Sequence, residues 1–132
     1  MLSENTIGQS MTEEEYTLIK DYCILPFVKN MVITNSDKIK EEGMTLGQLF
    51  VRSSLKVIQM IDDDINRSRM MVGKLKAKIT EVNRNDEGIL YEVELRGYVH
   101  RVALLRHVVR QEMADRRDKY IANLFKYLSQ IG

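Results

Sequence analysis

The spacing of apolar residues changes at Gly73, and this change constrains the fold more than any other feature of the 132-residue sequence. Before Gly73, apolar residues recur every three or four positions, as they do on one face of an α-helix. After it, apolar and charged residues alternate, which is typical of a strand with one buried face. We therefore predict an α+β fold, mostly helical, with two N-terminal helical segments, one antiparallel β-hairpin and one long C-terminal helix.

The first helical segment is predicted to begin at Thr12. Thr12 and Glu15 have the spacing of a capping box, in which each residue satisfies a backbone donor of the other. Pro26 lies inside the apolar pattern that follows, where it removes one backbone donor and crowds the preceding turn. We therefore expect a kink or a break near residues 22–25.

The second helix is predicted to begin at Thr45, which has the same capping-box spacing to Gln48. Its apolar stripe lasts about five turns and consists of Leu46, Leu49, Phe50, Ser53, Val57, Met60 or Ile61, and Ile65. Three aspartates, residues 62–64, interrupt the end of this stripe. Adjacent helix positions point about 100° apart, so three neighbouring carboxylates cannot converge on one metal ion. We interpret this acidic run as a solvated face.

A β-hairpin is predicted from about Lys74 to Tyr98. Its inward positions are Leu75, Ala77, Ile79, Tyr91, Val93 and Leu95. Between the two strands, residues 85–88 (Asn-Asp-Glu-Gly) suit a type I turn. Turn chemistry favours Asn85 opposite Ile89, whereas cross-strand charge favours Lys78 opposite Glu94. Both registers remain open from the sequence.

The last helix is predicted from about Arg101 to Ser129, and its end carries a dense apolar patch. The patch consists of Tyr120, Ile121, Leu124, Phe125 and Leu128. Such a patch either packs on the first two helices or forms an interface, to which tyrosine and phenylalanine are well suited. Since an exposed apolar patch usually binds a partner, we expect a homodimer with these residues at or next to its interface.

The two halves of the chain differ in charge although the net charge is +1. Residues 1–64 contain 6 Lys and Arg against 11 Asp and Glu, whereas residues 65–132 contain 14 against 8. In the basic half, Arg106, Arg110 and Arg117 share one side of the last helix and are candidate phosphate contacts. The acidic residues interleaved with them, which lower the positive potential, are Glu112, Asp115 and Asp118. Nucleic-acid binding is therefore the alternative function rather than the first.

The sequence shows no pattern of a catalytic or metal-binding site. Neither His100 nor His107 has a carboxylate or cysteine at a ligand spacing, so both are interpreted as surface or boundary histidines. Cys23 lies among apolar residues of the first helix, which predicts a buried side chain. Motifs for phosphate-binding loops and for serine nucleophiles are missing. We therefore expect no enzymatic activity, no cofactor and no metal.

The length of the chain is that of one domain, and we expect a flexible tail over residues 1–11 followed by a single domain over residues 12–132. No apolar run approaches the roughly 18 residues of a membrane span. The N-terminus lacks the basic and apolar regions of a secretory signal, and a single cysteine allows no internal disulfide. A cytoplasmic location without membrane attachment is expected.

Residues 65–127 contain three features in sequence order. They are Tyr91, the Arg96-Gly97-Tyr98 step, and a predicted long helix with Val108, Glu112 and Tyr127. In these features the chain resembles small phage and prophage proteins of Gram-positive bacteria. The resemblance implies a phage-associated bacterial protein that acts in the cytosol by binding, and it assigns no site residues. Together with the missing catalytic patterns, it favours a non-enzymatic regulator or adaptor that occupies the surface of an unidentified partner protein.

Overall fold

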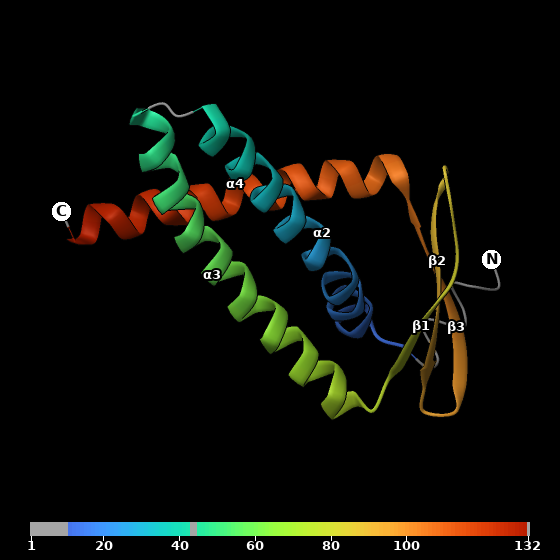
Figure 1. Ribbon diagram of the computed structural model, residues 1–132. Helices are drawn as coiled ribbons and strands as arrows, with labels where there is room; N and C mark the ends of the chain where they lie inside the picture. Colours follow the sequence, from blue (N-terminus) through green and yellow to red (C-terminus); the bar gives the residue numbers. More distant parts are fainter. Residues whose placement is uncertain (1–10, 43–44, 132) are drawn as a thin grey trace. The chain divides into compact units, whose positions relative to one another are not determined.

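The computed structural model of the protein describes residues 11–42 and 45–131, with side chains described for residues 11–35 and 52–126 (Figure 1). The elements in chain order are α2 (Glu13–Glu42), α3 (Thr45–Leu75), β1 (Lys78–Asn85), β2 (Gly88–Leu95), β3 (Tyr98–Leu105) and α4 (Arg106–Ile131). The predicted α+β class, mostly helical with a long C-terminal helix, is confirmed. The strands form one antiparallel sheet in the order β1-β2-β3, so a third strand extends the predicted hairpin.

The N-terminus of α2 is held by the predicted capping box. The backbone N–H of Thr12 donates to Oε1 of Glu15, and the N–H of Glu15 donates to Oγ1 of Thr12, both at 3.0 Å. The helix then runs through Pro26 to its end at Glu42, so the predicted break is wrong. Ile24 and Val28, on either side of the proline, are fully buried. Their burial outweighs the single backbone bond that the proline removes.

α3 ends later, and the first strand begins later, than the sequence predicts. Gly73 lies inside α3, and the residue after the helix, Lys76, has a left-handed φ of 57°. The N–H of Lys76 donates to the carbonyl of Gly73 at 3.0 Å, and the N–H of Ala77 donates to that of Val72 at 3.4 Å. These two bonds form a Schellman motif, with a lysine in the position that usually holds glycine. Leu75 and Ala77 therefore belong to the end of the helix and the link, not to the sheet.

Residues 98–105 form β3, where the sequence predicts the start of the last helix, so α4 begins at Arg106 rather than at Arg101. The covered positions of β3 are His100, Val102 and Leu104. Three of the alternate positions, Val99, Ala103 and Leu105, are apolar as well, which conceals the period of two. Arg96 and Gly97 join β2 to β3 with φ values of 51° and 83°, as in a two-residue type I′ hairpin turn.

The pairing of β1 with β2 changes register along its length. Lys78 lies opposite Glu94, which confirms the charge-based register at the open end of the hairpin. A bulge within residues 81–83 then shifts the pairing, so that Asn85 lies opposite Gly88 at the turn and the turn-based register is wrong. Oδ1 of Asn85 accepts hydrogen bonds from the backbone N–H of Gly88 at 3.2 Å and of the residue before it at 2.8 Å. These two bonds fix the turn.

The chain divides into two compact units, and each unit consists of two stretches of sequence. Unit 1 comprises Met1–Cys23 and Arg67–Gln111 and contains the sheet, and unit 2 comprises Ile24–Asn66 and Glu112–Gly132. The buried residues of unit 1 include Met11, Ile19, Cys23, Val72, Tyr91, Val93, Leu95, His100, Val102 and Leu104. Those of unit 2 include Ile24, Leu25, Val28, Val32, Val57, Ile61, Tyr120 and Leu124.

Met11 is buried, so the last residue of the expected tail belongs to the core of unit 1. Residues 1–10, the rest of that tail, lie outside the described residues. The single domain over residues 12–132 stays a prediction.

Gly88→Ala is expected to lower the free energy of unfolding by about 1–3 kcal/mol. A Cβ at this position would overlap the backbone carbonyl oxygen of Leu104 on β3, and φ at Gly88 is +157°. Urea denaturation of the parent and the variant measures the difference.

Gly73→Ala is the matched control. Gly73 lies inside α3, and a Cβ there would meet nothing within 4 Å. Alanine therefore improves helix propensity without a clash, and the expected change is a gain of about 0.5–1 kcal/mol. A Gly88→Ala variant as stable as the parent would contradict the pairing of Gly88 with Leu105.

Candidate interaction surfaces

α4 is apolar on two sides, and the chain covers one of them. Tyr120 and Leu124 are 8% and 6% exposed. The hydroxyl of Tyr120 donates a hydrogen bond to Oδ2 of Asp64 on α3 at 2.5 Å, within unit 2. These two residues of the predicted interface therefore belong to the core of the chain itself.

The second apolar side of α4 consists of Ile121 and Phe125, which together we call the α4 surface. The two residues are one helical turn apart, so their side chains lie on the same side of the helix. Phe125 is 66% exposed and Ile121 is 36% exposed. Leu128, the remaining residue of the predicted interface, lies outside the described side chains. The α4 surface is therefore the part of that interface which the structure leaves open to solvent.

The acidic run at the end of the α3 stripe is not only a solvated face. Oδ1 of Asp62 lies 2.7 Å from Nζ of Lys29 on α2, and Asp64 accepts the hydrogen bond from Tyr120 on α4. Asp63, between them, is exposed. The interpretation of the run as a solvated face thus holds for Asp63, but it omits the contacts by which Asp62 and Asp64 join α3 to other helices of unit 2.

The three candidate phosphate contacts lie on α4, in different surroundings. Arg106 and Arg110 are exposed. Nε of Arg117 donates to Oδ1 of Asp118 at 3.2 Å, so this arginine already has an acidic partner. Of the interleaved carboxylates, Asp118 thus pairs with one of the three candidate arginines, and Glu112 instead pairs with Arg116 at 3.2 Å.

The uncovered face of the sheet carries a hollow of about 230 Å³ beside the β1–β2 turn. Its lining residues are Asn83, Asn85, Glu87, Gly88, Ile89, Leu90, Ala103, Leu104 and Leu105. Amide and aliphatic groups predominate there, with one carboxylate from Glu87, so the hollow offers contacts but no pair of groups for acid–base chemistry. The sequence does not reveal this hollow, because Ala103, Leu104 and Leu105 of β3 fall within the predicted last helix.

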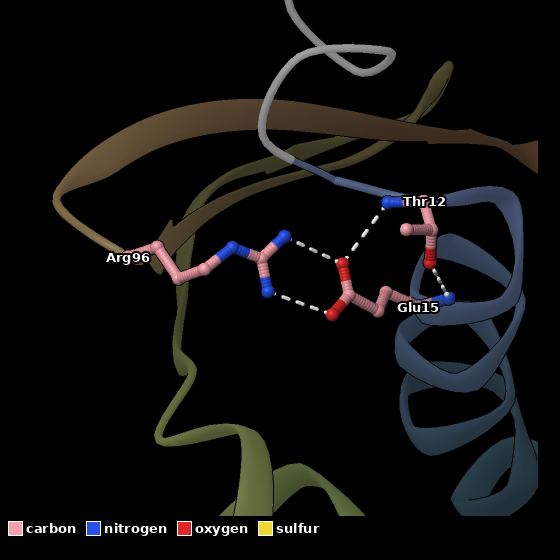
Figure 2. A network of polar contacts seen from close by, with 3 residues as sticks. All are labelled: Thr12, Glu15 and Arg96. Atoms are coloured by element: carbon pink, nitrogen blue, oxygen red, sulfur yellow. Dashed lines mark hydrogen bonds and ion pairs between the residues drawn. The ribbon is translucent and has the colours of Figure 1, made fainter.

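A bidentate ion pair joins the start of α2 to the β2–β3 turn within unit 1 (Figure 2). Nη1 and Nη2 of Arg96 donate to Oε2 and Oε1 of Glu15 at 2.7 and 2.8 Å. The same carboxylate accepts the backbone N–H of Thr12. The hydrogen bonds from Arg96 and then from Thr12 hold the pKa of Glu15 at about 2. The sequence does not predict this ion pair, because it does not predict the β2–β3 turn that places Arg96 beside the start of α2.

Cys23 on α2 and Tyr91 on β2 are buried next to each other in unit 1. Cys23 is buried as predicted, and burial raises the pKa of its thiol to about 12, although a hydrogen bond with Tyr91 lowers it. Burial also raises the pKa of Tyr91 to about 12. A protonated thiol is a poor nucleophile, so this pair contributes packing rather than chemistry.

The two histidines differ in environment. His100 is buried on β3, so its interpretation as a surface or boundary residue is wrong. Burial, followed by the nearby charge of Arg96, lowers the pKa of His100. His107 is exposed at the start of α4, as predicted.

Within residues 11–42 and 45–131, no group of three or more His, Cys, Asp or Glu side chains could hold a metal ion. In the same part of the chain, no helix combines the length and the apolar character that a membrane crossing requires.

Comparison with known proteins assigns a family to most of the chain. A family model described as YhjD protein matches residues 10–125, a range that includes the whole sheet and the α4 surface. No curated protein and no solved structure matches the sequence.

Glu15→Gln is expected to lower the free energy of unfolding by about 1–2 kcal/mol at pH 7, because the neutral amide loses the ion pair with a half-exposed Arg96. The pKa of Glu15 is lower in the folded state than its ordinary value of 4.5. The stabilisation is therefore present above pH 4.5 and is lost as the pH falls toward 2. Urea denaturation at both ends of this range measures it.

Glu14→Gln is the control for this prediction, because Glu14 is an exposed residue of the same first turn. Its expected effect at pH 7 is below about 0.5 kcal/mol. Equal stability of the parent and Glu15→Gln at pH 7, or a difference that persists at pH 2, would contradict the role of the ion pair.

The alternative of nucleic-acid binding is tested by changing Arg106, Arg110 and Arg117 together to Glu. We expect the parent chain not to bind duplex DNA even at about 50 mM salt, because carboxylates lie between these arginines. Fluorescence anisotropy over a range of salt concentrations measures this. Binding by the parent that falls steeply with salt, and that the triple variant abolishes, would establish the nucleic-acid function instead.

Proposed function

The chain belongs to the YhjD protein family, and we propose that this member is a non-enzymatic protein-binding adaptor or regulator that occupies the surface of a partner protein. One observation carries the proposal. Within a single turn of α4, Leu124 is 6% exposed and its neighbour Phe125 is 66% exposed. The helix thus presents an aromatic side chain to solvent beside a side that the chain itself has already covered.

The hydrophobic effect favours the binding of a partner to the α4 surface. Moving a side chain of this size from water into an apolar contact contributes about 1.5–3 kcal/mol. Phe125 and Ile121 are one turn apart, which is the spacing by which a helix inserts anchors into a partner groove. Aromatic residues are also enriched at the centres of protein interfaces. The α4 surface therefore fits a partner with an apolar groove or an apolar helix face.

The proposal includes the phage association and the cytoplasmic location that the sequence resemblance implies. It also includes a homodimer, as expected from the sequence, and it reserves the α4 surface for the partner protein. The buried Cys23 and His100 support a role without catalysis, because neither is open to a substrate.

Phe125→Lys is expected to change the free energy of unfolding by less than about 0.5 kcal/mol, because the side chain is exposed. Leu124→Ala, one position earlier and buried, is expected to cost about 2–5 kcal/mol. Urea denaturation compares the two. A large loss from Phe125→Lys would mean that this residue packs within its own chain.

Partner contact is tested by a photo-crosslinking amino acid at Ile121, in cells that naturally contain the protein. A discrete adduct is expected there, and Phe125→Lys should abolish it because it places a charge in the contact. The control is the same crosslinker at Asn123, an exposed residue about 160° around the helix from Phe125. No adduct at Ile121, or the same adduct from both positions, would contradict the proposal.

A further inference from the structure

The two edge strands of the sheet, β1 and β3, differ in how well each could pair with a strand of another chain. β1 is bulged between Glu81 and Asn83, and it carries an ion pair between Glu81 and Arg84 at 2.8 Å. Bulges and charges are the features that keep an edge from pairing with another strand. β3 pairs with β2 in one unbroken register over all of Tyr98–Leu105. In the described part of the chain, no further strand pairs with β3 on its other side.

The turn between β2 and β3 determines which backbone groups point outward. In a two-residue hairpin, the residues that flank the loop exchange both hydrogen bonds, and here these are Leu95 and Tyr98. Hydrogen-bonded and non-hydrogen-bonded pairs then alternate along the ladder. The N–H and carbonyl groups that point away from β2 are therefore those of Val99, Arg101, Ala103 and Leu105.

The side chains of the same four residues lie on the uncovered face of the sheet, and all four residues are exposed. Val99 is 55% exposed and Leu105 is 47% exposed. β3 thus presents free backbone donors and acceptors together with apolar side chains, which is the combination that strand addition uses.

One register allows β3 to pair with β3 of a second copy using all four outward residues. It is antiparallel and centred on Val102, and it places Val99 opposite Leu105 and Arg101 opposite Ala103 of the other copy. A register centred on Arg101 would place two guanidinium groups opposite each other, which is destabilising. Registers centred elsewhere leave Val99 or Leu105 without a partner. Charge and apolar contact therefore favour the same alignment.

We infer that two copies of the chain pair through β3 in this register and form one continuous six-stranded sheet about a two-fold axis. Such an axis uses the same surface on both copies, as most homodimers do. The inference concerns the sheet of unit 1 and does not rest on the α4 surface, so either can fail while the other holds.

The mass of the full chain in solution gives the first test. Light scattering after size exclusion, at tens of micromolar, is expected to give twice the 15.4 kDa of one chain. A monomeric mass overturns the inference. Phe125→Lys is expected to leave the dimer mass unchanged, and its conversion to a monomer would place the interface on α4 and overturn the inference.

Two double variants with the same substitution sites test the register. Val99→Lys with Leu105→Lys puts like charges opposite each other in both cross-strand pairs, and it is expected to be monomeric. Val99→Lys with Leu105→Glu puts opposite charges there and is expected to remain dimeric. Both residues are exposed, so circular dichroism should show the parent fold in each. Equal masses for the two double variants overturn the register, because only pairing of position 99 with position 105 distinguishes them.

Discussion

The sheet has one covered face, and much of the structure follows from that constraint. Three antiparallel strands need a covered apolar face to be stable in water. In unit 1 the start of α2 contributes to this cover, through Cys23 beside Tyr91 and through the ion pair of Glu15 with Arg96. Because side chains alternate along a strand, the residues between the covered positions lie on the other face, and in β3 these residues are exposed. The hollow and the exposed residues of β3 are a consequence of that alternation.

Elements with local signals could be predicted from the sequence, and elements defined by distant contacts could not. The capping box of Thr12 and Glu15 needs only three residues of separation, and it forms as expected. β3 was missed because three of its four outward positions are apolar, so the strand shows no alternation of apolar and polar residues. The register at the open end of the hairpin could be predicted, since opposite charges align Lys78 with Glu94. The register at the turn could not, because no sequence pattern indicates the bulge between Glu81 and Asn83.

The same distinction applies to the candidate interface on α4. The spacing of apolar residues shows that the helix has a wide apolar stripe, and this is correct. It does not show which part of the stripe the chain covers, because that depends on where α3 lies. The hydrogen bond from Tyr120 to Asp64 supplies this information, and the acidic run that contains Asp64 looked like an ordinary solvated segment. The sequence therefore identifies the helix, and the tertiary contact separates its core side from its open side.

Because Cys23 is buried, the rate at which its thiol is alkylated can measure local opening of unit 1. Cys23 is the single cysteine of the sequence, and its thiol stays protonated far above neutral pH. Alkylating reagents attack the thiolate, so labelling near pH 7 must wait until the contact with Tyr91 separates. The labelling rate then measures how often the covered face of the sheet is uncovered, and it separates this event from fluctuations elsewhere in the chain. The natural sequence thus already contains a site-specific probe of the stability of unit 1.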